Sequence, residues 1–373
     1  MSDSNSSSGG GIFKDAIRNY LAPIASFLDD DAISEVLING PDEIFVEVKG
    51  KLERRPAQFN SEDSLRAAVN AIAQFVGRRI SEHEPRLDAR LPEGFRIAAV
   101  IPPCSRKGTV VSIRKFTKSK MTFQDYIRLG AITVEGAQFL DLCMFLGKNI
   151  LVSGGTGSGK TTLLGLLCSR IPPGQRIIVI EDSSELTIEY EHVVPFETKQ
   201  ADVQGKGEVT IRDLLKSSLR LRPDRIIVGE VRSSEALELI NAMNTGHKGC
   251  MGTVHANSPQ DAIVRLEALA AGGDNKLSEK SLRHQVASAI DIILQISRYA
   301  DGSRRIASIA EVQGMDEQGN YRVVPIFEMS RMLRRKDGKL EGQLLLTGQP
   351  PSFASEIYDN IPNFPADFFS KKA

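Results

Sequence analysis

The chain has 373 residues, which is too long for one ordinary domain and indicates two or three. Lys+Arg and Asp+Glu each number 47, so the formal net charge is zero, which argues against a protein whose main partner is nucleic acid. No uncharged apolar run approaches the roughly 18 residues of a membrane span. The four cysteines form no CxxC pair. We therefore expect a soluble cytosolic protein with buried free thiols and neither zinc nor disulfides.

The first part of the chain is predicted to be a small α+β domain over residues 12–116. It follows a Ser/Gly-rich tail, residues 1–11, that lacks the apolar segment of a signal peptide and is expected to be disordered. A short polar and basic stretch, residues 117–121, is expected to be a linker. The elements predicted for the domain are a helix over 12–27, a hairpin of strands over 36–38 and 44–48, a helix over 61–76 with Ser61 as N-cap, and strands within 86–116.

Residues 122–330 alternate strand with helix. The predicted strands are 149–153, 175–180, 225–228 and 251–254, and the predicted helices are 161–170, 210–221 and 233–244. Continuous apolar strands alternating with helices favour an α/β domain with a mainly parallel sheet covered on both faces. Polar residues follow these strands, at the edge where open α/β sheets bind ligands. Residues 331–373 form a C-terminal extension with no assignable motif.

A glycine-rich loop lies between an apolar strand and an amphipathic helix and matches G-x-x-x-x-G-K-[ST]. Its glycines let backbone N–H groups surround an anion, and the helix that follows adds the positive end of its dipole. Lys160 is predicted to reach the β- and γ-phosphates and Thr161 to bind Mg²⁺. The predicted ATP-binding residues of the loop are Gly155, Thr156, Gly157, Ser158, Gly159, Lys160, Thr161 and Thr162.

Two further strand ends carry acids. Glu230 ends the apolar strand 225–228 and is a candidate Walker B carboxylate for Mg²⁺. The strand 175–180 ends in Glu181, Asp182 and Glu185, which are either an ordinary solvated strand end or, beside a phosphate loop, the source of an acid that orients the attacking water.

Two histidines and three arginines each have two interpretations. His247 and His255 bracket the strand 251–254, and a functional and a structural role are equally compatible with each, although His255 is at the phosphate edge. Arg90, Arg96 and Arg114 lie on predicted strands of the first domain. They are either solvent-facing charges or arginine fingers that reach ATP across an interface.

With these motifs the sequence resembles the type II/type IV secretion ATPase superfamily. More specifically, it resembles the CpaF/TadA branch, the motors of tight-adherence pilus systems. The resemblance covers about residues 31–313. The motifs that carry it are Val36–Asp42, Gly77–Arg79, Asp88–Pro92, Ser153–Thr162, Glu181–Glu185, Arg220–Arg232, Ala242–His247 and Thr253–Asn257. Departures are the short region before the first strand, about thirty residues, and the lack of the tetracysteine zinc site of some relatives.

The resemblance implies a cytoplasmic hexameric ring that binds ATP and Mg²⁺, with a RecA-like ATPase domain joined by a flexible linker to the N-terminal domain. It implies Glu185 as general base, Glu230 as Walker B acid, the histidine box near the γ-phosphate, and arginines of the first domain on the phosphates. Its partners would be polytopic inner-membrane platform proteins of a pilus or secretion system, so the protein would act at the inner face of the membrane.

The function predicted from the sequence is therefore an ATPase motor that powers assembly or retraction of a tight-adherence (type IV) pilus, or a type II-like secretion system. Three alternatives remain. The ATPase core alone does not separate this motor from a conjugation-type secretion ATPase of the VirB11 branch. A nucleic-acid translocase is disfavoured by the zero net charge. A nucleotide-binding subunit that hydrolyses little is disfavoured by the complete set of Lys160, Glu185 and Glu230.

Overall fold

The computed structural model describes residues 16–48, 50–91, 93–115, 121–202, 204–272, 277–335 and 337–370. The chain divides into two compact units. The first consists of Met1–Ser119 with Ala201–Glu208, and the second of Lys120–Gln200 with Val209–Ala373. The predicted tail, residues 1–11, lies outside the described residues, as does the predicted linker except for Met121.

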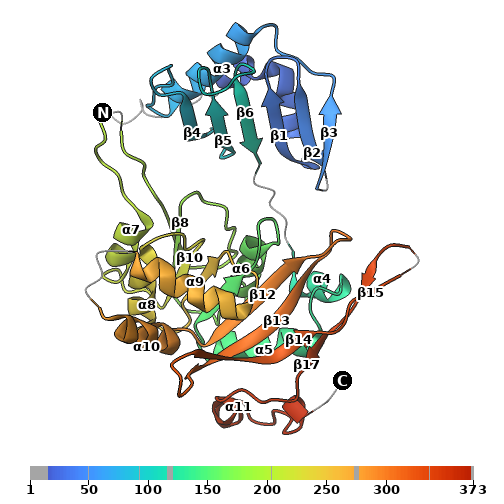
Figure 1. Ribbon diagram of the computed structural model, residues 1–373, viewed down its shortest axis with the longest axis vertical. Coiled ribbons are helices and arrows are strands. Elements are labelled where there is room, and N and C mark those ends of the chain that lie inside the picture. The colour runs from blue at the N-terminus through green and yellow to red at the C-terminus, as the bar shows by residue number, and fades with distance from the viewer. Residues whose placement is uncertain are drawn as a thin grey trace, which may run out of the picture. The chain divides into compact units, whose positions relative to one another are not determined.

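The first unit contains a six-stranded sheet in which every recorded pairing is antiparallel (Figure 1). Its order is β3-β2-β1-β6-β5-β4. The predicted hairpin is confirmed as β1 and β2, whereas β3 at the edge is an addition to the prediction. The strands are β1 (Ile33–Asn39), β2 (Ile44–Val48), β3 (Lys51–Arg55), β4 (Arg86–Arg90), β5 (Arg96–Val100) and β6 (Val110–Arg114).

Helices cover one face of this sheet. In α3 (Glu62–Phe75), Ser61 is the N-cap as predicted, and its hydroxyl accepts a hydrogen bond from the Ser64 N–H at 3.2 Å. The helix buries Leu65, Val69 and Ile72, which share one face at helical spacing and belong to the core of this unit. The single helix predicted over 12–27 is interrupted in its described part. A 3₁₀ turn (Ala22–Ile24), which contains a proline, leads into α2 (Ala25–Asp29).

The second unit is built on a nine-stranded sheet of order β17-β14-β13-β12-β7-β11-β10-β8-β9 (Figure 1). The six strands from β12 to β9 run parallel to one another, and β13, β14 and β17 extend the sheet antiparallel, which confirms the predicted α/β class. The strands are β7 (Ile150–Ser153), β8 (Ile177–Glu181), β9 (Val193–Glu197), β10 (Arg225–Val228), β11 (Met251–Val254), β12 (Ile292–Arg298), β13 (Arg304–Met315), β14 (Tyr321–Met329) and β17 (Leu344–Leu346).

Two apolar cores lie on the two faces of this sheet. Ile150 and Val152 of β7 belong to one core and Leu151 to the other, as alternation along a strand requires. The first core includes α5, α6 and the C-terminal part, and the second includes α7 to α10. The helices are α4 (Phe123–Arg128), α5 (Val134–Phe145), α6 (Lys160–Cys168), α7 (Ile211–Ser218), α8 (Glu235–Asn244), α9 (Pro259–Ala271), α10 (Glu279–Ala289) and α11 (Ala354–Asn360).

The C-terminal extension packs on the second unit. After a small hairpin, β15 (Leu333–Arg334) and β16 (Leu340–Glu341), strand β17 joins the large sheet and α11 follows. The ring of Phe139 on α5 lies 6.2 Å from that of Phe353 and 5.9 Å from that of Phe369. The aromatic residues of the extension thus complete one core of the sheet.

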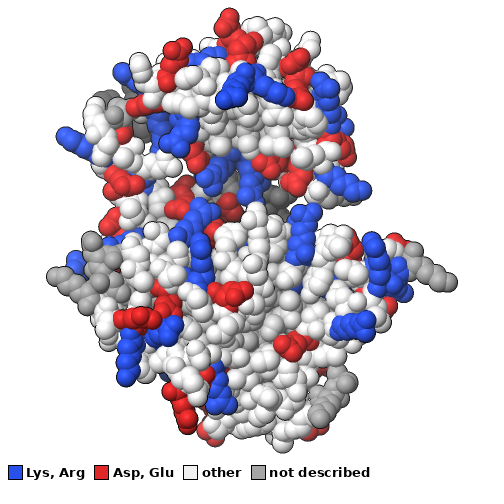
Figure 2. Space-filling view, in the orientation of Figure 1, with Lys and Arg blue, Asp and Glu red and all other residues white. Residues whose placement is uncertain are grey.

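Charge and thiol chemistry partly follow the prediction from composition. On the face shown in Figure 2, basic and acidic side chains are interspersed. No helix among the described residues is long and apolar enough to cross a membrane.

All four cysteines are free, but the prediction that all are buried is wrong for Cys104, which is exposed. Burial raises the pKa of the Cys250 thiol to about 12, so this thiol stays protonated at neutral pH.

Candidate functional site: a phosphate loop linked to a carboxylate cluster

The glycine-rich loop, residues 154–161 and called the phosphate loop, connects β7 to α6 and needs glycine at specific positions. Gly159 is the N-cap of α6 with φ of 98°, and Gly157 has φ of 69°, a region that favours glycine. At Gly154 a Cβ atom would lie 2.4 Å from the carbonyl oxygen of Ile296 on β12, so only glycine fits there. The loop therefore runs close against β12 and ends at the N-terminus of α6, where unpaired backbone N–H groups and the helix dipole favour an anion.

Lys160, the first residue of α6, joins the loop to His255. Its ammonium donates to the carbonyl oxygens of Gly154 at 2.9 Å and Gly155 at 3.1 Å, and lies 3.3 Å from His255 Nδ1. Nδ1 must accept from an ammonium, so the proton of a neutral imidazole is on Nε2. Nε2 lies 2.9 Å from Glu230 Oε1, to which it donates. Burial and the charge of Lys160 lower the pKa of His255, which favours this neutral form.

Glu230, which follows β10, is held on both carboxylate oxygens. Oε1 accepts from His255, and Oε2 accepts from Arg232 Nη2 at 2.5 Å. Arg232 also donates through Nη1 to Asp182 Oδ2 at 3.2 Å. Burial alone would raise the pKa of Glu230, but the hydrogen bond and charge of Arg232, together with His255 and Lys160, hold this pKa below its usual value. Glu230 is therefore an ionised carboxylate at neutral pH.

Glu185 lies in the segment after β8, the strand next to β10. This segment is turned by Glu181, a buried carboxylate whose Oε1 accepts the backbone N–H groups of Glu185 at 2.9 Å and Leu186 at 3.0 Å. The charge of Glu185 contributes to raising the pKa of Arg232, after the larger effects of Glu230 and Asp182. Of the two predicted acids, Glu230 therefore contacts Arg232 directly, whereas Glu185 acts on it through its charge.

Glu181 also explains the glycine before Glu230. A Cβ atom at Gly229 would lie 2.9 Å from Glu181 Cγ, so a larger residue would displace the buried carboxylate. Burial raises the pKa of Glu181, although its two backbone N–H donors oppose the rise. Glu181 thus positions the two acidic segments relative to each other.

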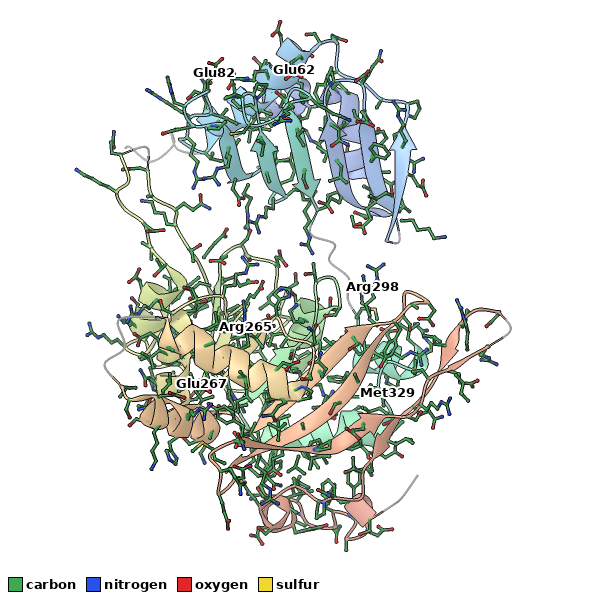
Figure 3. All side chains as sticks on the ribbon, in the orientation of Figure 1. Glu62, Glu82, Arg265, Glu267, Arg298 and Met329 are labelled. Atoms are coloured by element: carbon green, nitrogen blue, oxygen red, sulfur yellow. The ribbon has the colours of Figure 1, made fainter. Side chains whose placement is uncertain are left out.

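The turn between β12 and β13 supplies two arginines that the sequence analysis did not select. Arg304 Nε donates to the carbonyl oxygen of Gly157 at 2.9 Å, and its Cδ would lie 3.2 Å from a Cβ atom at Gly159. Arg298, at the end of β12 (Figure 3), has Nη1 3.8 Å from the position of a Cβ atom at Gly157. Two guanidinium groups therefore lie against the tip of the phosphate loop.

The three candidate arginines of the first unit form a row. Arg90 on β4 is paired with Arg96 on β5, which is paired with Arg114 on β6. Directly opposed residues point to the same face of a sheet, and the next position in register, Ile97 with Ile113, is buried in the core. The arginine row therefore lies on the face away from that core. Arg96 is ion-paired there with Asp88 at 2.7 Å.

The two predicted histidines are at opposite edges of the large sheet. His255 follows β11 and contacts Lys160. His247 precedes β11, whose first residue, Met251, is paired with Ile150 at the start of β7. His247 is therefore separated from the phosphate loop by the length of the strand, and its carbonyl oxygen accepts from Cys250 Sγ at 3.1 Å.

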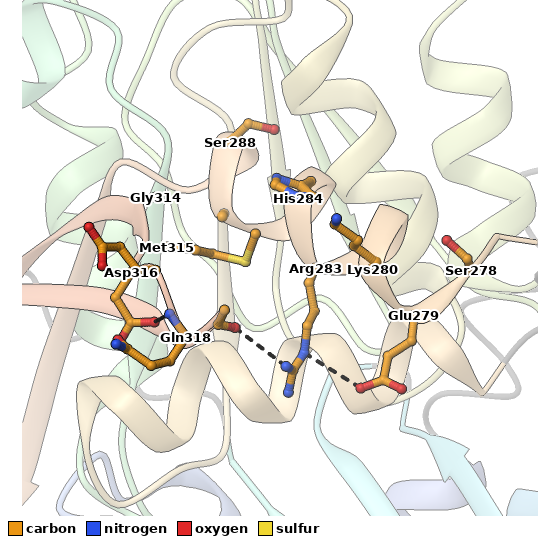
Figure 4. A pocket seen from close by; sticks show the side chains of 13 residues that line it. Ser278, Glu279, Lys280, Arg283, His284, Ser288, Gly314, Met315, Asp316 and Gln318 are labelled. Carbon is orange, nitrogen blue, oxygen red and sulfur yellow. Dashed lines mark hydrogen bonds and ion pairs between the residues drawn. The ribbon is translucent and has the colours of Figure 1, made fainter.

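A separate pocket of about 860 Å³ lies between α10 and the turn joining β13 to β14 (Figure 4). β13 pairs Glu311 with Ile292, the first residue of β12, so this turn lies beyond the amino end of β12 and away from the phosphate edge. Arg283 bridges the pocket, with Nη1 donating to the Gly319 carbonyl oxygen at 3.4 Å and Nε to Glu267 at 3.1 Å. Its lining includes none of the predicted nucleotide-binding residues.

Comparisons of the sequence find relatives that match most of the chain. The chain is 36% identical over 310 residues to a conjugal transfer protein of Mycobacterium tuberculosis, covering 82% of this chain and 87% of that protein. It is 34% identical over 334 residues to the type IV secretion system protein VirB11 of Bartonella henselae, covering 79% and 92%.

Solved structures support the fold. The pilus retraction motor PilT with bound ADP aligns with a TM-score of 0.59 at 21% identity, covering 90% of this chain and 85% of that one. The ATPase DotB of Legionella pneumophila aligns with a TM-score of 0.55 at 18% identity, covering 81% and 82%. A family model described as "Type II/IV secretion system protein" matches residues 18–336. The chain therefore belongs to the type II/IV secretion system protein family.

Proposed function

We propose that the chain is an ATPase motor that hydrolyses ATP to ADP and phosphate and uses the reaction to move its domains. The observation that carries the proposal is the chain of contacts from Lys160 through His255 to Glu230. It joins a phosphate-binding ammonium to a strand-end carboxylate at the edge where α/β sheets bind ligands. Hydrolysis needs both groups at one nucleotide, and the fold brings them together.

The residues at this edge suit a nucleotide with Mg²⁺. Lys160 is a buried ammonium that now donates to carbonyl oxygens of its own loop, and phosphate oxygens are stronger acceptors for it. The Thr161 hydroxyl, in the first turn of α6, and the Glu230 carboxylate are oxygen ligands of the kind Mg²⁺ prefers. When bound, Mg²⁺ would offset negative charge on the phosphates.

Glu185 is proposed as the general base that orients water. Its charge acts on Arg232, which contacts Glu230, and it is not the acid that the His255 imidazole contacts. Lys160 and the loop N–H groups would hold the phosphates, and neutral His255 would keep Glu230 aligned with them. The proposed nucleotide contacts in the loop are Gly155, Thr156, Gly157, Ser158, Gly159, Thr161 and Thr162.

The proposal extends to a homo-hexamer in which the arginine row supplies positive charge to the phosphates of its own or a neighbouring subunit. The support is the resemblance described above and the alignment of Arg90, Arg96 and Arg114 on one face. Replacing Arg114, the exposed member of the row, with alanine should weaken turnover and leave the fold intact. Unchanged kinetics would return this row to ordinary surface charge.

For the machine that it serves, we propose a tight-adherence pilus system, with inner-membrane platform proteins as partners at the cytoplasmic face. The motifs of the CpaF/TadA branch, including 36–42 and 220–232, support this assignment. A second candidate is a type IV secretion motor, which the names of the Mycobacterium and Bartonella relatives favour. Deletion of the gene in its host separates them. Loss of pili supports the first, and loss of conjugal or protein export with intact pili supports the second.

The hydrolysis proposal is tested by steady-state ATP turnover of the purified chain. Glu185→Gln keeps the size of the side chain and removes the base, so turnover should fall about 100-fold. Glu191→Gln, at an exposed acid further along the same segment, is the matched control and should retain wild-type turnover. A wild-type chain that binds MgATP without hydrolysing it would contradict the motor proposal, and an unaffected Glu185→Gln would remove this residue from it.

A further inference from the structure

Arg232 lies at the centre of the carboxylates at the phosphate edge. Its Nη2 donates to Glu230 at 2.5 Å and its Nη1 to Asp182 at 3.2 Å. These acids follow two neighbouring strands, β10 and β8, which are paired from Arg225 with Ile177 to Val228 with Ile180. One guanidinium therefore bridges two strand ends, and Glu185 contributes to the same field.

The backbone from which this side chain extends is anchored independently. The N–H groups of Arg232 and Ser233 donate to Glu235 Oε1 at 2.5 Å and 2.8 Å. Glu235 is buried in the first turn of α8, where an acid also suits the helix dipole. Val231 N–H donates to the Thr253 carbonyl oxygen on β11 at 2.8 Å. The start of the Arg232 side chain is therefore fixed to a helix and to a neighbouring strand.

The contacts of Arg232 offset repulsion between neighbouring carboxylates. Asp182, Glu185 and Glu230 are three acids at one sheet edge, and like charges this close repel one another unless a cation lies among them. His255 contacts only Oε1 of Glu230, whereas Arg232 contacts two of the acids at once. A planar guanidinium can hold two carboxylates in fixed directions, which a lysine ammonium does less well.

We propose that Arg232 is a positioning residue for hydrolysis: it bridges Glu230 and Asp182 and fixes the direction of the Glu230 carboxylate. The inference rests on the proposed ATPase function. Nη1 and Nη2 of Arg232 both donate to carboxylates. We therefore expect Arg232 to act through Glu230 and to contribute little to nucleotide binding. Loss of the bridge displaces the acid, and a displacement of about 1 Å at a catalytic group costs on the order of 100-fold in rate.

The first test separates positioning from binding. Arg232→Gln should lower kcat about 10- to 100-fold, while the Kd for a fluorescent ADP analogue with Mg²⁺ stays within about threefold of wild type. Arg232→Lys should recover part of the lost kcat, because it restores the charge but not the fork. Arg212→Gln is the matched control, since it breaks an arginine–glutamate contact of 3.1 Å to Glu238 elsewhere in the same unit. A weakened Kd with unchanged kcat would show that Arg232 binds the nucleotide and would overturn the proposal.

The second test is a double-mutant cycle in single-turnover hydrolysis. If Arg232 acts through Glu230, Arg232→Gln should cost little in a Glu230→Gln background. An equal fold-loss in both backgrounds would overturn the inference and leave the ATPase assignment intact. Absence of hydrolysis in the wild-type chain would instead defeat the proposed function. Circular dichroism and thermal unfolding of each variant keep a folding defect distinct from either result.

Discussion

Two buried cations lie at opposite edges of the nine-stranded sheet, and each sits in a cradle of glycines. Lys160 is 8% exposed at the phosphate edge, and Arg225, the first residue of β10, is 3% exposed at the other. Burial lowers the pKa of both groups. Around Arg225, a Cβ atom at Gly249 would lie 1.5 Å from Nη1. The guanidinium itself fills that cradle, whereas the loop before Lys160 leaves its backbone N–H groups to an anion.

The partners of the two cations differ accordingly. Arg225 donates to Gln175 Oε1 at 2.6 Å and to the Met144 carbonyl oxygen at 2.8 Å, and so ties β10 to the ends of other elements. Lys160 is linked through His255 to the acid Glu230. A buried cation therefore indicates function only when its partners can be exchanged for a ligand, and structure when its partners are fixed parts of the core.

The largest effect is expected from Lys160→Ala. It removes the main positive charge on the phosphates, so ATP turnover should fall at least about 100- to 1,000-fold. The change takes the donor from the buried Gly154 carbonyl oxygen and from the exposed Gly155 carbonyl oxygen, so the free energy of unfolding should fall by only about 1 kcal/mol. Turnover and urea unfolding on the same preparation check both parts. A severe loss of stability would make Lys160 a structural cation like Arg225.

Arg225→Ala should show the reverse pattern. It leaves the buried Met144 carbonyl oxygen and the half-buried Gln175 amide oxygen without their donor and opens a cavity, so unfolding should become easier by about 3 kcal/mol. Turnover per folded molecule should stay at the wild-type level below the melting transition. Arg225→Met fills the same space without charge and should lose less stability than the alanine variant. If Arg225→Ala unfolds like wild type, the second cradle contributes nothing to stability.

The secondary structure was predictable where a local pattern is sufficient. β10 and β11 have the predicted bounds because each is an apolar run between turn signals, and α3 begins directly after its predicted N-cap, Ser61. β3 was missed because Lys51–Arg55 is almost entirely exposed and shows no alternation of apolar and polar residues. Its place at the sheet edge comes from pairing with β2, not from its own composition.

The site was predictable only in part, for the same reason. The phosphate loop is contiguous, so its motif names Lys160 directly. The two contacts of His255 are to residues far away in the sequence, and they support the functional one of its two predicted roles. Arg304 reaches Gly157 across 147 positions, and the arginine row exists only in the register of β4, β5 and β6. No spacing rule in a single sequence contains such contacts.

We expect the shape of the phosphate loop to depend on Arg304, which contacts the tip of the loop from the first position of β13. Its hydrogen bond to the Gly157 carbonyl oxygen holds the tip of the loop, so Arg304→Ala should weaken nucleotide binding about tenfold, or about 1.4 kcal/mol. Titration with a fluorescent ADP analogue measures this. Arg322→Ala, at an exposed position on β14, removes the same charge from the same unit and should leave the Kd unchanged. Equal Kd values for the two variants would mean that the loop keeps its shape unaided.

The smallest effect is expected at Asp301, a fixed structural group in the same turn as Arg304. Ser303 Oγ donates to its Oδ1 at 2.6 Å and Leu340 N–H to its Oδ2 at 2.9 Å, and these bonds lower its pKa from 3.8 to about 2. A depressed carboxylate pKa stabilises the fold above the ordinary value, and this stabilisation is lost as the pH falls toward the lowered one. Asp301 is half-buried and still partly reached by solvent, so Asp301→Asn should cost under about 1 kcal/mol at neutral pH.

That cost should shrink as the pH falls from about 4 toward about 2, because the wild-type carboxylate is then protonated and loses its advantage over the amide. Urea unfolding of both proteins at several pH values measures the difference directly. Asp359→Asn, at an exposed position on α11, removes the same charge and should show no such dependence on this bond network. A difference that stays constant down to the lowest pH would show that Asp301 acts by its shape alone. The turn between β12 and β13 would then be held by the shape of this side chain, and the negative charge of Asp301 would add nothing to its stability.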